Sequence, residues 1–141
     1  MAAPDVAARM GSIGREIVQH EFRFRDYVYD LATFGGIELP KISVVVPDYH
    51  YGHPFYARLG TIAAQNIPVH ELIVLDDAST DDSVTVINGF AERALIPIQL
   101  IVNETNSGSV FHQWRKGVEV ATGGLIWIVE ADDLSDRNFL R

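Results

Sequence analysis

The chain of 141 residues contains no cysteine, so it can form neither a disulfide framework nor a thiolate metal site. This absence fits a reducing compartment. No apolar run reaches the roughly 18 residues of a membrane span, and no hydrophobic signal segment opens the chain. The sequence therefore predicts a cytoplasmic protein.

Basic residues are also scarce. Eleven Lys and Arg stand against nineteen Asp and Glu, which gives a net charge of −8 and an isoelectric point near 4.9. Nonspecific binding to nucleic acid needs a basic surface, and so does strong attraction to an anionic membrane. We therefore expect no nucleic-acid partner.

Several signature motifs are missing as well. The chain has no G-x-G-x-x-G fingerprint, no Walker A motif and no G-x-S-x-G nucleophile turn. His50 and His53 lie close together in sequence, but no third neutral ligand accompanies them, so we expect no histidine metal site.

Two apolar runs that end in acid are the most informative features present. They are ELIVLDDAST, residues 71–80, and GLIWIVEADD, residues 124–133. Apolar runs rich in β-branched residues predict strands buried on both faces. Carboxylates at the carboxyl ends of parallel strands lie where open α/β folds bind their ligands. The pattern indicates a site for a ligand with hydroxyls, phosphates and a metal ion.

The order of periodic segments predicts a βαβαβαβ fold with a Rossmann-like parallel sheet. Ser79, followed three residues later by Asp82, has the spacing of a helix capping box. We expect strands at 42–46 (closed by Pro47), 71–75, 97–102 and 125–129, and helices at 53–66, 80–94 and 109–122.

The first 40 residues are expected to form a helical extension, and residues 41–141 the α/β domain. An amphipathic helix is predicted from residue 13 to about residue 33, stopped by Gly35 and Gly36. Its apolar positions are Ile13, Ile17, Phe24, Val28 and Leu31. We expect it to dock on this or a preceding domain; the alternative, a membrane-surface helix, has too few basic residues.

Acids that follow the second and fourth predicted strands are the candidate ligand-binding residues. Asp76 and Asp77 can accept hydrogen bonds from a base or a ribose, or can simply favour the next helix dipole. Glu130, Asp132 and Asp133 offer the hard oxygen ligands that Mg²⁺ or Mn²⁺ prefers, or form a solvated acidic turn.

Two loops offer further candidates. In Pro47-Asp48-Tyr49-His50 the backbone could pass close to a ligand and Tyr49 could pack on a base, although a plain connection suits these residues equally. In NETNSGS, residues 103–109, Gly108 would allow the backbone to approach a phosphate before a helix N-terminus. Trp114, on the following helix, is expected in the core.

Four blocks in this order, ISVVVPDYH, ELIVLDDASTDDS, NETNSGS and GLIWIVEADD, resemble the N-terminal part of a family 2 glycosyltransferase with the GT-A fold. The resemblance covers roughly residues 41–141. VFHQWRKG followed by IWIVEADD resembles a bacterial subgroup within larger enzymes of surface-polysaccharide synthesis.

This resemblance implies that a sugar passes with inversion from a nucleoside-diphosphate donor to a glycan or lipid-linked acceptor. Pro47 and Tyr49 would line the nucleoside pocket, Asp77 would contact the base, and Asp76 would support that loop. Glu130 to Asp132 occupies the place of the family's Asp-x-Asp motif. Asp132 would hold Mg²⁺ or Mn²⁺ on the diphosphate, with Asp133 beside it.

Three departures from the family pattern stand out. His50 replaces the usual Asn, and Glu130 replaces the first Asp of the metal motif. The family's general base is expected beyond Arg141. We therefore expect the donor-binding half of a longer enzyme, inactive alone, with a peripheral position at the inner membrane as one option for the whole.

An apolar edge at 125–129 would be unpaired in such a piece, and we expect self-association through it or through the N-terminal helix. The alternative function is a nucleotide-sugar-binding module without transfer. A signalling receiver domain would carry an acid pair after its first strand and a phosphoacceptor Asp after its third. It is disfavoured here, because the first predicted strand ends in Pro47 and the third in Asn103-Glu104.

Overall fold

The computed structural model describes residues 6, 8–14 and 24–141, which divide into two units, Met1–Leu39 and Pro40–Arg141. In the first unit residues 8–14 are helical and α2 spans Phe24–Phe34. The amide of Gly36, whose φ is 73°, bonds to the Thr33 carbonyl at 3.0 Å and ends the helix as predicted. The middle of the predicted helix, residues 15–23, lies outside the described residues.

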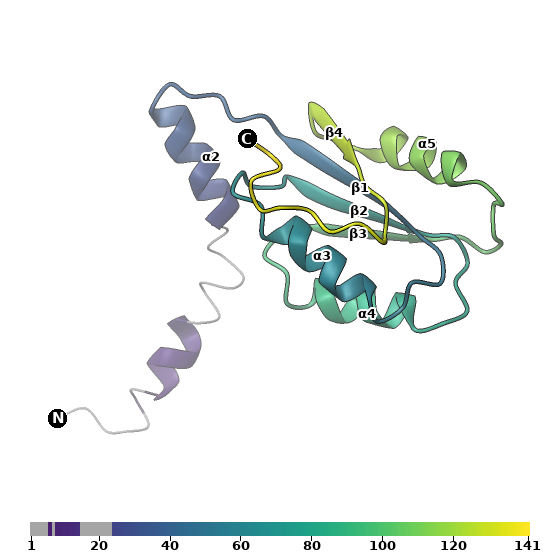
Figure 1. Cartoon of the computed structure of the whole chain (residues 1–141). Helices are drawn as coiled ribbons and strands as arrows, with labels where there is room; N and C mark the ends of the chain where they lie inside the picture. Colours follow the sequence, from purple (N-terminus) through teal and green to yellow (C-terminus); the bar gives the residue numbers. More distant parts are fainter. Residues whose placement is uncertain (1–5, 7, 15–23) are drawn as a thin grey trace. The chain divides into compact units, whose positions relative to one another are not determined.

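The second unit has the predicted βαβαβαβ order (Figure 1). Its elements are β1 (Ile42–Asp48), α3 (Phe55–Ala63), β2 (Glu71–Asp76), α4 (Ser83–Ala91), β3 (Ile98–Val102), α5 (Val110–Val120) and β4 (Leu125–Ile128). All pairings are parallel, and the strand order is β3-β2-β1-β4. The predicted α/β Rossmann-like fold is confirmed. No helix in the described part of the chain is long and apolar enough to cross a membrane.

Helices cover both faces of the sheet, with α3 and α4 on one side and α5 on the other (Figure 1). Successive side chains of a strand point to opposite faces. Val44 and Val46 therefore pack toward Leu59 of α3, whereas Val45 packs with Leu75 on the side of α5. Every residue of β1 is buried, which explains why its sequence is a continuous apolar run.

Strand β1 is longer than predicted, because Pro47 does not end it. The Val45 carbonyl accepts a bond from β4's side, from Val129, and the Asp48 carbonyl accepts one from Asp77 on β2's side. Backbone groups alternate along a strand, so the proline nitrogen faces β4's side. The ladder with β4 ends at Val45, because Pro47, the next position that faces β4, has no N–H with which to continue it.

The helices are shorter than predicted, and the expected capping box is wrong. Helix α4 begins at Ser83, and its N-cap residue Asp82 makes no side-chain capping bond. Ser79 Oγ instead accepts the backbone N–H of His50 at 2.9 Å. The Ser79 hydroxyl thus joins the loops after β1 and β2, and it does not serve as the N-cap of α4.

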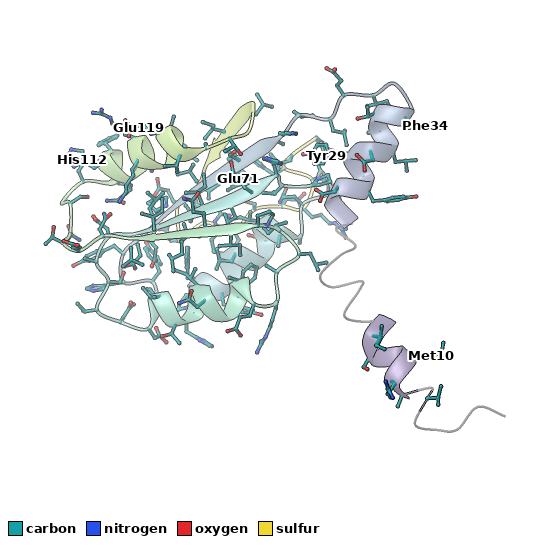
Figure 2. All side chains as sticks on the ribbon, turned by 180° about the vertical axis from the view of Figure 1, so that it is seen from behind. Met10, Tyr29, Phe34, Glu71, His112 and Glu119 are labelled. Carbon is teal, nitrogen blue, oxygen red and sulfur yellow. The ribbon has the colours of Figure 1, made fainter. Side chains whose placement is uncertain are left out.

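The amino ends of β1, β2 and β4 are tied together through Glu71, whose side chain is labelled in Figure 2. Its Oε1 accepts hydrogen bonds from Ser43 Oγ at 2.6 Å and from Thr122 N and Oγ1 at 2.7 and 2.8 Å. Burial alone would raise the pKa of Glu71, but these bonds lower it below its ordinary value. The turn between α5 and β4 is thereby fixed, which places the acids that follow β4.

Strand β4 is an edge of the sheet, as expected. Leu125, Ile126 and Ile128 are 54%, 40% and 38% exposed. The sheet therefore presents apolar side chains beside an edge without a neighbouring strand among the described residues. Self-association through this edge or through the N-terminal helix stays a prediction.

Candidate functional site

A cavity of about 360 Å³ opens at the carboxyl end of the sheet. The strand order reverses between β1 and β4, and the ends of both strands line the cavity, so it lies at the topological switch point of the fold. Its walls are formed by Pro47, Asp48, Tyr49, Tyr51, Asp77, Asn106, Gly108, Ser109, Val110, Gln113, Glu130 and Ala131. Five predicted site residues, Pro47, Tyr49, Asp77, Gly108 and Glu130, are among them.

Asp77 is the centre of a hydrogen-bond network at this cavity. Its Oδ1 accepts bonds from Asn103 Nδ2 at 2.7 Å, Ser107 N at 2.9 Å and Gln113 Nε2 at 2.8 Å. Its Oδ2 accepts one from Ser107 Oγ at 2.7 Å. Burial alone would raise the pKa of Asp77, but these donors lower it below its ordinary value. Asp77 is thus ionised, and Oδ2 keeps room for a further donor.

Gln113 is a wall residue that the sequence did not reveal. Its side chain is 2% exposed, and its Nε2 donates to both Asp77 Oδ1 and Ser107 Oγ. These bonds fix the amide orientation and leave Oε1 buried without a partner among the described residues. The segment VFHQWRKG contained the only sequence indication of this role, because Gln113 is a polar residue on the buried side of α5. Trp114, expected in the core, is half-buried and packs edge-on against Phe111.

Asp76 lies outside the cavity wall. It is fully buried, and its Oδ1 accepts the backbone N–H of Ser79 at 3.0 Å. Ala78 between them has a φ of 63°, a conformation that a non-glycine residue adopts only when its surroundings impose it. Asp76 therefore holds the tight turn that carries Asp77.

Asp48 is the second wall residue missed from sequence. Ending the predicted strand at Pro47 concealed it, because only the longer strand pairs Asp48 with Asp76 in register. Asp48 is 2% exposed, and within the described residues neither of its carboxylate oxygens has a hydrogen-bond partner. Burial raises the pKa of Asp48 to about 7; the nearby Ser83 hydroxyl opposes the rise, and the charge of Asp76 adds to it.

Asp48 should make folding stability depend on pH. Its pKa rises from 3.8 to about 7 on folding, so the folded chain holds a proton that the unfolded chain has lost between these values. The slope of stability with pH follows the difference in bound protons, so this contribution is greatest below pH 3.8 and is lost as pH rises through about 7. We expect Asp48→Asn, which mimics the protonated acid, to be the more stable protein above neutrality.

Urea unfolding at several pH values between about 5 and 8 would measure this effect. The stability difference between Asp48→Asn and the parent chain should grow as pH rises and level off above neutrality. Comparing the two proteins cancels the contributions of groups that do not interact with Asp48. Parallel pH profiles would contradict the assignment.

His50 has a structural role that explains why it can replace Asn. Its φ is 60°, in the left-handed region where Asn, Asp and His are the most frequent non-glycine residues. Its Nε2 accepts the backbone N–H of Thr80 at 2.9 Å, and its ring stacks on Tyr49 with centroids 4.1 Å apart. His50 thus joins the loops after β1 and β2 and sets the position of Tyr49 in the cavity wall.

Gly108 lies in the wall where the loop after β3 turns into α5. Its φ is 69°, and its N–H donates to Asn106 Oδ1 at 2.7 Å. A Cβ at this position would meet no atom within 4 Å, so backbone conformation, not crowding, favours glycine.

The three acids after β4 have different surroundings. Glu130 lines both the main cavity and a second cavity of about 460 Å³, which Asp133 lines together with Trp127 and Phe139. Asp132 is exposed near Tyr51, whose pKa is raised by burial and then by Asp132. Among the described residues no three His, Cys, Asp or Glu side chains form a group that could enclose a metal ion.

These acids nonetheless fit a divalent cation shared with a ligand. Burial raises the pKa of Glu130, and the charges of Asp132 and Asp133 raise it further. A cation would relieve this repulsion. Mg²⁺ characteristically binds one or two carboxylates and completes its shell with water and substrate phosphates, so a full protein cage is not required.

An open parallel α/β sheet with an acid-lined cavity at its switch point defines a ligand-binding domain of the nucleotide-binding kind. Comparison with known proteins identifies the family. The chain belongs to glycosyltransferase family 2, because the family model described as "Glycosyl transferase family 2" matches residues 43–141. The resemblance noted from the sequence is thereby confirmed.

Individual relatives agree with this. An uncharacterized glycosyltransferase of Escherichia coli, YibD, is 33% identical over 66% of this chain and 26% of its own length. A PGL/p-HBAD biosynthesis glycosyltransferase of Mycobacterium bovis is 30% identical over 67% of this chain and 36% of its own. The chain thus spans about a quarter to a third of the length of these relatives.

Solved structures show the same fold. Residues 1–349 of Staphylococcus aureus TarS in complex with UDP match with a TM-score of 0.65 and 27% identity, over 71% of this chain and 30% of that one. A mannosyltransferase of Pyrobaculum calidifontis matches with a TM-score of 0.64 at 23% identity, over 89% of this chain and 40% of that one. The predicted GT-A architecture is confirmed.

Proposed function

We propose that residues 41–141 bind the nucleoside-diphosphate sugar of an inverting glycosyltransferase, which passes the sugar to a glycan or lipid-linked acceptor. The observation that carries this is the cavity at the switch point, with the ionised Asp77 in its wall. A solved structure of Staphylococcus aureus TarS, 28% identical to this chain, was obtained in complex with UDP-GlcNAc, which supports a nucleotide-sugar donor.

In this proposal Asp77 accepts an N–H of the base through Oδ2, and Asp76 holds the turn that presents it. Tyr49, fixed by its stacking on His50, packs against the nucleoside beside Pro47. The positive φ of Gly108 lets the backbone before α5 approach the diphosphate. The general base is expected beyond Arg141, so the acceptor is activated by another part of the protein.

Glu130, Asp132 and Asp133 would hold a divalent cation, Mg²⁺ or Mn²⁺, with Asp132 as the principal ligand. Such an ion, when bound, neutralises the leaving diphosphate as charge develops on it. Without it the diphosphate would enter an acid-lined cavity and be repelled. The chain's own task is to hold these carboxylates at the mouth of the nucleotide cavity.

A second candidate is a module that binds the nucleotide sugar without transferring it. Glu130 in place of the first Asp of the metal motif favours it, because the longer side chain changes the reach of that carboxylate. Sugar transfer by a protein that contains these residues would separate the two.

Calorimetric titration with UDP, GDP and dTDP, each with and without Mn²⁺, tests the proposal. We expect one nucleotide to bind, and Mn²⁺ to strengthen its binding about tenfold or more, since relief of the repulsion between the acids and the diphosphate by about 1.4 kcal/mol is enough for a tenfold gain. Asp132→Ala should remove that gain. Asp30→Ala, an exposed acid on α2, is the control and should retain it. No binding of any nucleotide, or an unaltered gain in Asp132→Ala, would contradict the proposal.

A further inference from the structure

Arg58 is a buried cation that the donor site described above does not use. It lies on α3 and is 2% exposed. Burial lowers the pKa of Arg58, whereas the charges of Asp133, Asp132 and Glu130 raise it. Burying a guanidinium is costly unless its donors are satisfied, so its bonds should reveal what it does.

The two shorter bonds of Arg58 go to the two ends of one short segment, and a third, from Nη1 to Thr61 Oγ1 on the same helix, is 3.5 Å long. Arg58 Nε donates to the backbone carbonyl of Glu130 at 2.9 Å, and Nη1 donates to Ser135 Oγ at 2.7 Å. The segment between these anchors contains Asp132 and Asp133, the proposed metal ligands. We call residues 130–135 the acid turn.

The guanidinium forms no ion pair with a carboxylate within the described part of the chain. It reaches a carbonyl and a hydroxyl, so the acids of the turn keep their oxygens available. The ring of Trp127, on β4, lies 5.9 Å from the guanidinium carbon and adds a cation–π contact. One side chain of α3 therefore contacts the strand before the acid turn, its first residue and its last.

We infer that Arg58 is the positioning residue of the acid turn: by holding Glu130 and Ser135 at once, it sets the carboxylates where a donor-bound divalent cation would need them. This inference rests on the proposed function. Fixed partners that orient metal ligands without touching the metal typically contribute 10–100-fold to metal affinity. Arg58 acts through the backbone at Glu130 and through Ser135, and it is not among the residues that line the nucleotide cavity.

Substitution of Arg58 by lysine distinguishes a positioning role from a role of the positive charge alone. Arg58→Lys keeps the positive charge, but a single ammonium group cannot copy a planar fork whose nitrogens reach two acceptors in different directions. Arg115→Lys is the matched control, because Arg115 is an exposed arginine on α5 whose partner is Glu119, at 2.8 Å.

The test measures nucleotide affinity of the whole chain by calorimetry with and without Mn²⁺, beside thermal unfolding. We expect Arg58→Lys to fold and to bind nucleotide alone within about twofold of the parent, and to lose at least about tenfold of the Mn²⁺-dependent gain. Arg115→Lys should keep the gain. An unchanged gain in Arg58→Lys would overturn the inference, as would equal losses with and without metal, which indicate a general structural role.

Amide hydrogen exchange over residues 131–136 gives a second readout that needs no ligand. Faster exchange confined to this segment in Arg58→Lys is expected, and exchange equal to that of the parent would overturn the inference. Should the parent bind no nucleotide, the proposed function fails and this readout still decides the role of Arg58. Ser135→Ala, which removes only the far anchor, serves if Arg58→Lys does not fold.

Discussion

Asp77→Ala is expected to lower nucleotide affinity by about 100-fold, which corresponds to losing a hydrogen bond to a charged group together with the order around it. The substitution removes the acceptor of four hydrogen bonds, from Asn103, Gln113 and two groups of Ser107. These donors come from the loop after β3 and from α5. Without Asp77 the wall that carries Gly108 loses its attachment to β2.

The same substitution should also lower the free energy of unfolding by about 3 kcal/mol, because it leaves several donors unsatisfied in a buried setting. Urea unfolding measures the loss, and calorimetry measures the affinity. Asp82→Ala is the control: this exposed acid makes no capping bond at α4, so we expect a change within about 0.5 kcal/mol. Equal effects of the two substitutions would show that the network around Asp77 contributes nothing.

Gly117→Ala is expected to destabilise the chain by about 3 kcal/mol, although alanine favours helices. A Cβ at Gly117 would lie 2.3 Å from Val45 Cγ1 and 3.0 Å from Leu75 Cδ1. Real atoms do not approach so closely, and both neighbours are fully buried in β1 and β2. Helix α5 must therefore move outward, which exposes the apolar face of the sheet and displaces Gln113.

Gly60→Ala is the matched control, because Gly60 is also helical but a Cβ there meets no atom within 4 Å. It should stabilise the chain by about 0.5–1 kcal/mol, the usual difference between these residues in a helix interior. Urea midpoints of both variants test the argument. A gain for Gly117→Ala as well would show that α5 does not need the close approach to β1.

The order and direction of the helices and strands could be predicted because the sequence patterns that mark strands and turns are local. Buried parallel strands read as continuous apolar runs, and the turn formers between them mark the connections. The strand end at Pro47 was misjudged because β1 continues to Asp48 through its pairing with β2, while the proline nitrogen faces the other side of the strand. The capping box failed at Ser79 because a distant backbone group, His50 N, takes its hydroxyl.

The candidate site was predictable in part, from the loops that contain Pro47, Tyr49 and Gly108 and from the acids that follow two of the strands. Asp77 and Glu130 were found in this way, and both line the cavity. Asp48 and Gln113 were not found, because their roles depend on register with Asp76 and on the close packing of α5. Arg58 belongs to no recognisable sequence motif. Its proposed role depends on two hydrogen bonds to residues more than 70 positions away in the chain.

The short ladder between β4 and β1 has a consequence for local unfolding of the sheet. Four register pairs join β4 to β1, whereas six join β1 to β2, and the side chains of β4 are the more exposed. We expect a region with few buried contacts to open at a lower free energy than the rest of the sheet. Strand β4 leads into the acid turn, so in the proposed function the donor's affinity would include the free energy of closing this region. A donor that contacts both Asp77 and the acid turn would then stabilise the attachment of β4 to the rest of the sheet.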